Sequence, residues 1–486
     1  MLPVLTPAEM AARDAAAIAG GVSEATLVDR AGGAVARGAR RLLGGAYGRR
    51  VVIVCGKGNN GADGRVAAER LAGWGARVDR FDLAGRDQPG LDRPAFDRTG
   101  LDRALGRAGL AIDAMFGTGF NGPLAGDAAY AADALTAAGC PVLAVDIPSG
   151  VDGLTGAVRG TAVAAVATVC LAALKPGLVL YPGAAFAGDV DVADIGIDTH
   201  TPPPPLGLTE EADVAAWLPR RGPDSHKWSV GGVYVVGGSQ GMTGAVMLSA
   251  RAALRAGAGI VVAGLPGDAA ILASGGEVIT RPLAATSSGA LDEAAVKEIL
   301  DGLDRFRALV VGPGLGRATA TVAAVRRLVA EAHVPLVLDA DGLNALDGDI
   351  DLLARRPAAT VVTPHAGEYA RLAGEKVGDD RVAAARRLAE RAGAIVVLKG
   401  SRTVVADPTG RAAINPTGGP WLATAGTGDV LSGVVGALAA GGLPAFRAAA
   451  AGAWLHGKAA DSAGHAGLVA GDLVDALPSV LARLAA

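Results

Sequence analysis

The chain has 486 residues, too many for one ordinary hydrophobic core, so two domains are the simplest expectation. Alanine and glycine dominate a composition that is 51% apolar but only 3% aromatic, which favours helices packed closely on parallel sheets. The formal net charge of -3 and the lack of a dense basic stripe exclude a nucleic-acid-binding protein of the usual kind. The composition therefore predicts an α/β protein without a nucleic-acid partner.

The cysteines and the apolar runs indicate where in the cell the protein is found. Cys55, Cys140 and Cys170 lie in or beside apolar runs, and they form neither a disulfide framework nor a zinc-binding pattern. The N-terminus lacks the basic and apolar regions of a secretory signal, and no apolar run is long enough to span a bilayer. We therefore expect a cytoplasmic protein that does not associate with membranes.

The first half begins with an alanine-rich amphipathic helix over residues 7–19. A strand over residues 51–55 follows, then a glycine loop and a helix that continues to Trp74. Further strands are predicted at residues 110–115, 142–146 and 165–171, and glycine, proline or serine follows each of them. This order predicts a Rossmann-like, doubly wound domain with its functional loops at the carboxyl ends of the strands.

A proline run at residues 202–205 cannot continue a helix or a central strand, so the chain is divided there into residues 1–205 and 206–486. A second series of strand–loop–helix units follows, with strands expected at residues 232–236, 308–311, 334–338, 360–362 and 394–398. The two halves do not read as repeats of each other. The sequence thus predicts a second, different α/β domain.

Residues 56–61 form a Gly-x-Gly-x-x-Gly loop between a strand and a helix, where backbone amides and the helix dipole hold phosphate. Asp82 lies where a dinucleotide-binding fold keeps its ribose-binding carboxylate, so an ordinary NAD-dependent dehydrogenase is one reading of this pattern. Two further loops, residues 113–123 and 146–153, each place a carboxylate at a strand end. Oxygen ligands for a weakly bound cation would come together at one sheet edge from Asn60, Asp113 and Ser149. The alternative is that Asp113 and Asp146 only cap nearby helices or turns.

Together these loops resemble those of NAD(P)H-hydrate epimerases, over residues 10–198. The resemblance implies that Asn60, Asp113 and Ser149 bind potassium, and that Asp146 contacts the substrate and transfers a proton at the epimerising centre. It implies that two loops hold the hydrated cofactor, through Asn59, Asn60, Gly61, Ala62 and Asp63 and through Gly117, Thr118, Gly119, Phe120, Asn121, Gly122 and Pro123. The chain departs from the family at Ala62, where glycine is usual, and at Gly122, where many members have a basic residue.

In the second half, residues 415–420 run into residues 424–430 and an apolar helix. The glycines let backbone amides approach an anion, the helix N-terminus favours negative charge, and Asp429 is placed to accept a proton from a hydroxyl. Asp429 could instead be a simple helix cap. Residues 399–403 offer two cations and hydroxyls for nucleotide phosphates, and the alternative for them is a solvated hairpin. The pattern indicates an anion hole with a base.

These segments resemble the corresponding segments of ADP/ATP-dependent NAD(P)H-hydrate dehydratases of the ribokinase-like fold, and so do residues 236–239, 312–316, 339–344 and 363–368. The resemblance covers the chain from about residue 208 onward. The resemblance implies hydrate contacts by Ala245, Gly314 or Gly316, His365 and Asp429. It implies nucleotide contacts by Lys399, Gly400, Ser401, Arg402, Thr403 and Gly428. His365 alone would be an ordinary loop histidine. Trp228 and Ala425 replace glycines that are usual in the family.

The two resemblances predict a bifunctional repair enzyme that acts on hydrated NADH and NADPH. It would epimerise the R and S hydrates and dehydrate the S epimer, with magnesium present and ADP cleaved to AMP and phosphate. Asp429 would deprotonate the hydrate's hydroxyl for attack on the terminal phosphoryl group, and phosphate would then leave, expelled by the ring nitrogen's lone pair. The resemblance also implies a homo-oligomer. The alternative is a vitamin-precursor kinase of ribokinase-like fold, fused to a ligand-sensing or protein-binding domain.

Overall fold

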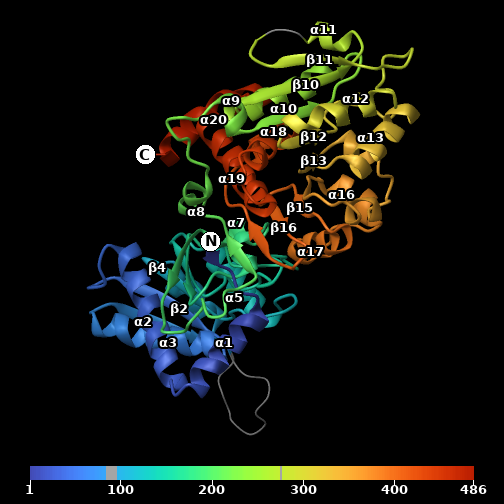
Figure 1. Ribbon diagram of the computed structural model, residues 1–486. Coiled ribbons are helices and arrows are strands. Elements are labelled where there is room, and N and C mark those ends of the chain that lie inside the picture. Colours follow the sequence, from blue (N-terminus) through green and yellow to red (C-terminus); the bar gives the residue numbers. More distant parts are fainter. Residues whose placement is uncertain (84–95, 274–275, 486) are drawn as a thin grey trace. The chain divides into compact units, whose positions relative to one another are not determined.

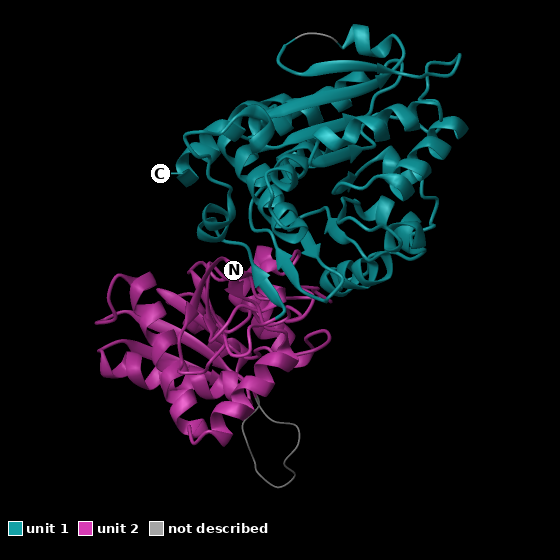
Figure 2. Ribbon diagram, in the orientation of Figure 1, with its two compact units in different colours: residues 1, 205–486 teal, residues 2–204 magenta. Residues whose placement is uncertain are grey.

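The structure is a computed structural model that describes residues 1–83, 96–273 and 276–485. It divides into two compact units, residues 2–204 and residue 1 with residues 205–486 (Figure 2). Among the helices of the described residues, none is both long and apolar enough to cross a membrane.

A six-stranded parallel sheet forms the centre of the first unit, in the order β3–β2–β4–β5–β6–β7. The chain passes from β2 outward to β3 and then returns to the other side of β2, so the winding reverses between β2 and β4. In such sheets ligands bind at the carboxyl ends of the strands beside this reversal. The expected doubly wound fold is confirmed, with strands β2 (Arg50–Cys55), β3 (Arg77–Asp82), β4 (Leu110–Ala114), β5 (Val142–Val145), β6 (Ala167–Leu171) and β7 (Asp189–Ala193).

Helices cover both faces of this sheet. Residues of α2 (Glu24–Leu43) and α3 (Asn59–Gly73) pack in one core, and residues of α4 (Arg98–Leu105) and α5 (Gly126–Thr136) pack in the other. A side chain at Gly32 of α2 would lie 2.5 Å from Cβ of Val66 on α3, so the two helices approach too closely for any residue but glycine there. The short elements of the unit are β1 (Leu2–Pro3), α6 (Pro176–Val179) and α7 (Ala184–Ala187).

Helix α1 (Pro7–Ala19) has the bounds expected from the sequence. Thr6 accepts a hydrogen bond from the backbone N–H of Glu9, and the Glu9 side chain accepts one from the backbone N–H of Thr6. This capping box fixes the start of α1, which carries cavity-lining residues of the site described below.

The second unit is built on a larger, mixed sheet in the order β8–β17–β16–β15–β14–β13–β12–β9–β10–β11. β16 is antiparallel to both of its neighbours, and the other pairs are parallel. Its winding reverses between β9 and β12. The strands are β8 (Leu206–Leu208), β9 (Gly232–Val236), β10 (Ile260–Pro266), β11 (Ile279–Leu283), β12 (Ala308–Val311), β13 (Leu336–Leu338), β14 (Thr360–Val362), β15 (Ile395–Leu398), β16 (Val404–Ala406) and β17 (Ala412–Ile414).

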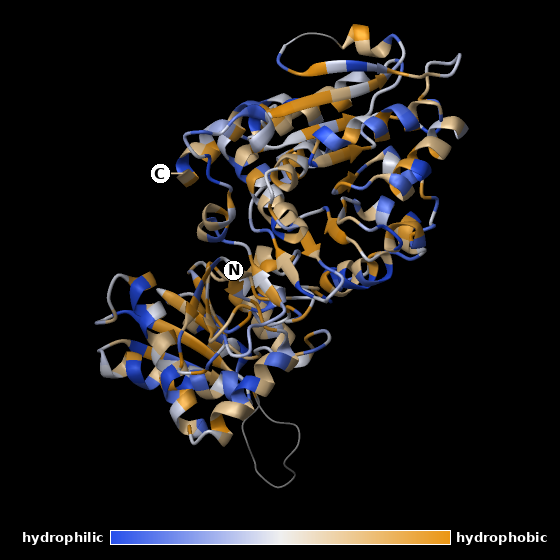
Figure 3. Ribbon diagram, in the orientation of Figure 1, coloured by the Kyte–Doolittle hydropathy of each residue, from blue (hydrophilic) through white to orange (hydrophobic). Residues whose placement is uncertain are grey.

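Figure 1 shows one group of helices on each side of this sheet, and Figure 3 shows the apolar strands between them. One group is α10 (Thr243–Arg255), α18 (Thr427–Ala440), α19 (Ala445–Ala463) and α20 (Ala470–Ala485); the other is α12 (Ala295–Gly302), α13 (Thr319–Glu331), α16 (Ala366–Ala373) and α17 (Arg381–Ala392). Short helices complete the unit: α8 (Glu211–Trp217), α9 (Lys227–Val230), α11 (Ala269–Leu272), α14 (Asp341–Asn344) and α15 (Asp351–Ala354).

Helix α18 packs directly against α10. A side chain at Gly433 of α18 would lie 2.0 Å from the backbone oxygen of Ser249 on α10, and the hydroxyls of Ser249 and Ser432 lie 3.2 Å apart. Small residues therefore hold the helix that carries Asp429 against the backbone of its neighbour, as the alanine- and glycine-rich composition suggests.

Candidate active sites

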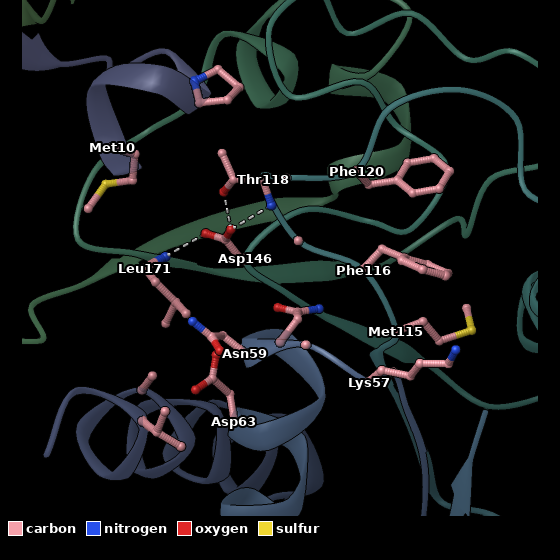
Figure 4. A pocket seen from close by; sticks show the side chains of 18 of the residues that line it. Met10, Lys57, Asn59, Asp63, Met115, Phe116, Thr118, Phe120, Asp146 and Leu171 are labelled. Atoms are coloured by element: carbon pink, nitrogen blue, oxygen red, sulfur yellow. Dashed lines mark hydrogen bonds between the residues drawn. The ribbon is translucent and has the colours of Figure 1, made fainter. Parts of the chain in front are cut away.

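A cavity of about 1280 Å³ opens in the first unit at the carboxyl ends of β2, β4 and β5, beside the reversal of winding. Its walls come from the loops after these strands and from α1, α2 and α3. Asp146 lies in the middle of the view in Figure 4, with Asn59 and Asp63 on one side and Phe116 and Phe120 on another. The rings of Phe116 and Phe120 are 4.8 Å apart. The volume suits a ligand at least as large as a nucleotide.

The carboxylate of Asp146 is held by four donors. One oxygen, Oδ2, accepts hydrogen bonds from the backbone N–H of Thr118 at 3.1 Å and from the Thr118 hydroxyl. The other, Oδ1, accepts from the backbone N–H of Leu171 at 3.3 Å and from the ammonium group of Lys175. Asp146 also has a φ of 64°, an uncommon backbone conformation that an aspartate tolerates better than most residues. Its position is therefore strongly determined by its surroundings.

Lys175 is the buried cation of this site. Its side chain is 1% exposed, and Nζ also donates to the backbone oxygen of Leu171 at 2.8 Å. Burial by itself opposes both charges, but the ion pair and its hydrogen bonds outweigh it. The pKa of Asp146 is therefore lowered, and the pKa of Lys175 is raised. No sequence pattern singled out Lys175 as a site residue.

Two more carboxyl groups line the same cavity, Asp14 on α1 and Asp63 on α3. Burial, and next the negative charge of Asp146, raise the pKa of Asp63 to about 8. Burial also raises the pKa of Asp14, against the opposing charge of Lys175. The cavity thus combines an ionised carboxylate with a carboxyl group that is largely protonated at neutral pH. Asp14 was not expected from the sequence.

The proposed potassium ligands are partly brought together. The hydroxyl and the backbone N–H of Ser149 each donate to Asp113 at 2.7 Å, and burial raises the pKa of Asp113 to about 6. Asn60 has no hydrogen bond to either residue, and its buried Nδ2 has no partner among the described residues. The Ser149 hydroxyl also accepts a hydrogen bond from the backbone N–H of Phe116 at 3.0 Å, so potassium binding by these three residues stays a prediction.

Nine of the expected substrate-binding residues line the cavity: Asn59, Asn60, Asp63, Gly117, Thr118, Gly119, Phe120, Asn121 and Asp146. Gly61, Ala62, Gly122 and Pro123 are not among its lining residues. A side chain at Gly61 would lie 1.9 Å from the backbone oxygen of Gly56, so Gly61 permits the tight approach of its helix to the loop. Lys57 and Phe116 line the cavity and were missed, although both lie in loops that the sequence singled out.

In the second unit, Asp429 lies in the first turn of α18. The N-cap is Gly426, with a φ of 89°, and no side chain caps the first turn. This leaves backbone N–H groups of that turn for an anion, as the glycine pattern predicted. Among the described residues no side chain or backbone group donates to the Asp429 carboxylate, so a cap role is not what the structure shows for it.

Around Asp429 the structure gathers acidic residues and one lysine. The ammonium group of Lys399 lies 3.0 Å from the Asp339 carboxylate and 3.7 Å from that of Glu368. A side chain at Gly428 would lie 3.3 Å from this ammonium group, so the helix start and Lys399 are neighbours. Burial, and next the charge of Asp339, raise the pKa of Asp429 to about 7, against the effect of Lys399. Asp429 is thus poised to exchange a proton near neutral pH.

Residues 399–403 form the turn between the antiparallel strands β15 and β16, which is the hairpin reading of the sequence. Lys399 lies with the carboxylates, and its pKa is raised because Asp339 and Glu368 outweigh the effect of burial. Arg402 has a φ of 61° and donates to the backbone oxygen of Pro416. The cations of this segment therefore face different partners, and the predicted nucleotide contacts of Gly400, Ser401 and Thr403 stay predictions.

The expected hydrate contacts lie in several places. Gly314 and Ala245 are adjacent, since a side chain at Gly314 would lie 3.1 Å from Cβ of Ala245. Gly316 donates its N–H to Asp341 at 2.9 Å and lines a cavity of about 330 Å³. That cavity lies beside the reversal of winding between β9 and β12.

His365 is the N-cap of α16, where its Nδ1 accepts hydrogen bonds from the backbone N–H groups of Gly367 and Glu368. Its observed role is therefore capping, and hydrate binding by it stays a prediction.

Within residues 1–83, 96–273 and 276–485, no group of three or more histidine, cysteine, aspartate or glutamate side chains is arranged to hold a metal ion. The potassium site expected from the sequence would not be found by this criterion, because it contains only one carboxylate.

Trp228 stands where the family favours glycine. It packs edge-on against Phe306, with ring centres 5.8 Å apart, so this departure has a structural use.

Family models cover most of the chain. The model described as NAD(P)H-hydrate dehydratase matches residues 233–481, and the model described as YjeF-related protein N-terminus matches residues 24–98 and 90–177. The second unit also resembles a ribokinase-like superfamily protein from Enterococcus faecalis, with a TM-score of 0.52 at 21% identity, covering 58% of this chain and 97% of that one. That likeness confirms the ribokinase-like fold.

Two similar sequences and one similar crystal structure support the same family for this chain. The bifunctional NAD(P)H-hydrate repair enzyme Nnr of Moorella thermoacetica is 42% identical, over 92% of this chain and 90% of that one. Its counterpart in Salinibacter ruber is 41% identical, over 99% and 96%. A crystal structure of the ADP/ATP-dependent NAD(P)H-hydrate dehydratase from Bacillus subtilis, co-crystallised with ATP and Mg²⁺, is 31% identical with a TM-score of 0.50, covering 57% of this chain and 98% of that one. The chain belongs to the family of bifunctional NAD(P)H-hydrate repair enzymes.

Proposed function

We propose that the first unit interconverts the R and S hydrates of NADH and NADPH, and that the second unit dehydrates the S hydrate while ADP is cleaved to AMP and phosphate. The observation that carries this proposal is that one chain holds two unlike sites, each in a unit that resembles one of these two enzymes. Epimerisation in the same chain lets the dehydratase consume both epimers.

In the second unit, Asp429 would accept the proton of the hydrate's hydroxyl as that oxygen attacks the terminal phosphoryl group of the nucleotide. Its pKa of about 7 suits this exchange, and backbone N–H groups at the uncapped start of α18 would stabilise the negative charge that develops. The resulting phosphate is a far better leaving group than hydroxide, and the lone pair of the ring nitrogen expels it. The product is NADH or NADPH.

The nucleotide would be bound by Lys399, Gly400, Ser401, Arg402, Thr403 and Gly428. Lys399 supports this assignment because its ammonium group lies beside Gly428 at the start of α18. Magnesium, held by the nucleotide phosphates with a nearby carboxylate such as Asp339, would neutralise phosphate charge. The hydrate would contact Ala245, Gly314 or Gly316, His365 and Asp429.

In the first unit, the hydrated ring would lie against Asp146, between the loop of residues 59–63 and the loop of residues 117–123. Potassium held by Asn60, Asp113 and Ser149 would supply a fixed positive charge and keep Asp113 ionised. Asp146 would be the final acceptor of the proton that leaves the hydrate's hydroxyl.

The alternative, a vitamin-precursor kinase fused to a sensing or protein-binding domain, is disfavoured by identity that extends over both halves of the bifunctional relatives. We propose a cytoplasmic location, where the three free cysteines would stay reduced. The expected homo-oligomer is testable by light scattering of the purified chain.

The direct test is recovery of NADH absorbance from a mixture of both NADH hydrates with ADP and magnesium. Complete recovery by the intact chain supports both activities. Recovery of only the S fraction would remove the epimerase assignment. No recovery with ADP or with ATP would remove the dehydratase assignment and direct attention to vitamin-precursor alcohols as phosphoryl acceptors.

A further inference from the structure

The carboxylate of Asp146 has no vacant acceptor position. Two carboxylate oxygens offer about four lone-pair positions in all. Two backbone N–H groups, one hydroxyl and one ammonium group occupy them, from Thr118, Leu171 and Lys175. A substrate hydroxyl can therefore reach this carboxylate only by displacing one of these donors or by acting through one of them.

The four donors differ in whether they can pass a proton to Asp146. The backbone N–H groups of Thr118 and Leu171 cannot exchange protons in this way. Lys175 lines the cavity, but its ammonium group has no lone pair with which to accept a proton. Its N–H groups are directed to Asp146, to the Leu171 backbone oxygen at 2.8 Å and to the Cys170 sulfur at 3.6 Å. The Thr118 hydroxyl both donates and accepts hydrogen bonds, and Thr118 lines the cavity. Figure 4 shows Thr118 directly beside Asp146.

We propose that the hydroxyl of Thr118 is a catalytic group of the first unit, which takes the proton of the hydrate's hydroxyl while passing its own proton to Asp146. The proposal rests on the epimerase function proposed above. Lys175 and the Leu171 amide are positioning groups, because they fix the far oxygen of Asp146 and leave the near oxygen, Oδ2, to Thr118.

The step balances without an oxidant or a reductant. The hydroxyl that is lost on dehydration sits on a carbon bonded to the ring nitrogen. As its O–H bond breaks, a C=O bond forms and the C–N bond breaks, and that electron pair moves to the nitrogen, where the conjugated carboxamide delocalises it. Rotation turns the other face of the carbonyl to the nitrogen. The C–N bond forms again, and the proton returns from Asp146 through Thr118 to the oxygen.

The test compares Thr118→Val with Thr118→Ser in the full chain. Both keep the backbone N–H that donates to Asp146, but only serine keeps the hydroxyl. Pure S hydrate is incubated without nucleotide, and the appearance of the R hydrate is followed by chromatography. Loss of a general acid–base group costs roughly 10²–10⁴-fold. We expect a loss of that size in kcat for Thr118→Val, little change in KM, and near-normal turnover for Thr118→Ser.

Dehydration of pure S hydrate with ADP serves as the internal control, because it depends on residues of the second unit, and it should be unchanged in both variants. Thr118→Ala replaces Thr118→Val if the latter fails to fold by circular dichroism. Epimerisation at the normal rate by a folded variant without the hydroxyl would overturn the proposal, and so would a Thr118→Ser chain as slow as Thr118→Val. If the unmodified chain does not epimerise, the proposed function itself fails.

Discussion

Each unit places an aspartate near a lysine, yet the two aspartates are in opposite states. In the first unit Lys175 bonds directly to Asp146 and its pKa is lowered. In the second unit Lys399 bonds to Asp339 instead, and the pKa of Asp429 is raised to about 7. A lysine therefore does not by itself decide the charge of a neighbouring carboxyl group. At Asp429, burial and next the charge of Asp339 outweigh Lys399, whereas at Asp146 the direct contact with Lys175 and the other hydrogen bonds outweigh burial.

The difference corresponds to two kinds of chemistry. A carboxylate whose acceptor positions are filled keeps its charge and its position, and it acts through its neighbours. A carboxyl group without hydrogen-bond donors, raised toward neutrality by burial and like charge, is a better direct base because its protonation state changes near the working pH. The proposed phosphoryl transfer at the second site would need such a direct base, whereas the proposed epimerisation would need a proton that leaves and then returns.

The largest expected effect is on the direct base. Asp429→Asn keeps the shape of the side chain but removes its basicity, and loss of a general base costs roughly 10²–10⁴-fold. We expect NADH formation from pure S hydrate with ADP to fall by at least the lower figure. The matched control is epimerisation of the same sample without nucleotide, which should continue. A chain with Asp429→Asn that dehydrates within a few-fold of normal would show that Asp429 is not the base.

The next effect concerns stability of the first unit. Lys175→Met leaves Asp146 buried without its cation, and breaking a buried ion pair in this way costs about 3–5 kcal/mol. The double variant Lys175→Met with Asp146→Asn removes both charges and should recover much of that loss. Urea unfolding of the four chains measures the coupling. If the double variant is no more stable than Lys175→Met alone, the ion pair does not contribute as described.

A smaller effect is expected on the pH dependence of the second site. Asp339 raises the pKa of Asp429 by like charge, so Asp339→Asn should lower it. The reactive, ionised form of Asp429 would then persist to lower pH, and the acid limb of the rate profile for dehydration would move toward acid. Asp341 acts in the same direction but more weakly, so Asp341→Asn is a matched control with a smaller displacement. An acid limb that does not move, or moves toward alkaline pH, would contradict this electrostatic account.

The sequence predicted what depends on local pattern. Strands over residues 232–236, 308–311 and 360–362 have the expected bounds. Asp113, near the end of β4, meets Ser149, in the loop after β5, at one sheet edge as expected. Asp429 lies at a helix start behind glycines, which is also a local signal. The strands that were not predicted include β3, β7, β8, β10, β11, β16 and β17. β3 and β11 contain charged residues, and short apolar runs such as β16 look alike in helices and strands.

Contacts over long sequence separations were not predictable in the same way. Lys175 meets Asp146 from 29 residues away, and Lys399 meets Asp339 from 60 residues away. Both contacts depend on where the side chains point once the strands are packed, which no spacing rule encodes. The state of each aspartate was therefore beyond the sequence, although the aspartates themselves were not.

Gly433 lies four positions beyond Asp429 and meets only protein backbone, where even a methyl group would lie 2.0 Å from the Ser249 oxygen. Any larger residue must push α18 away from α10 and carry Asp429 with it, and a displacement of about 1 Å at a reacting group costs on the order of 10²-fold in rate. A mutational scan of this chain would therefore score Gly433 as essential for turnover, although it never meets a ligand. Some positions that such a scan scores as essential would therefore be residues that hold Asp429 in position and not residues that take part in the reaction.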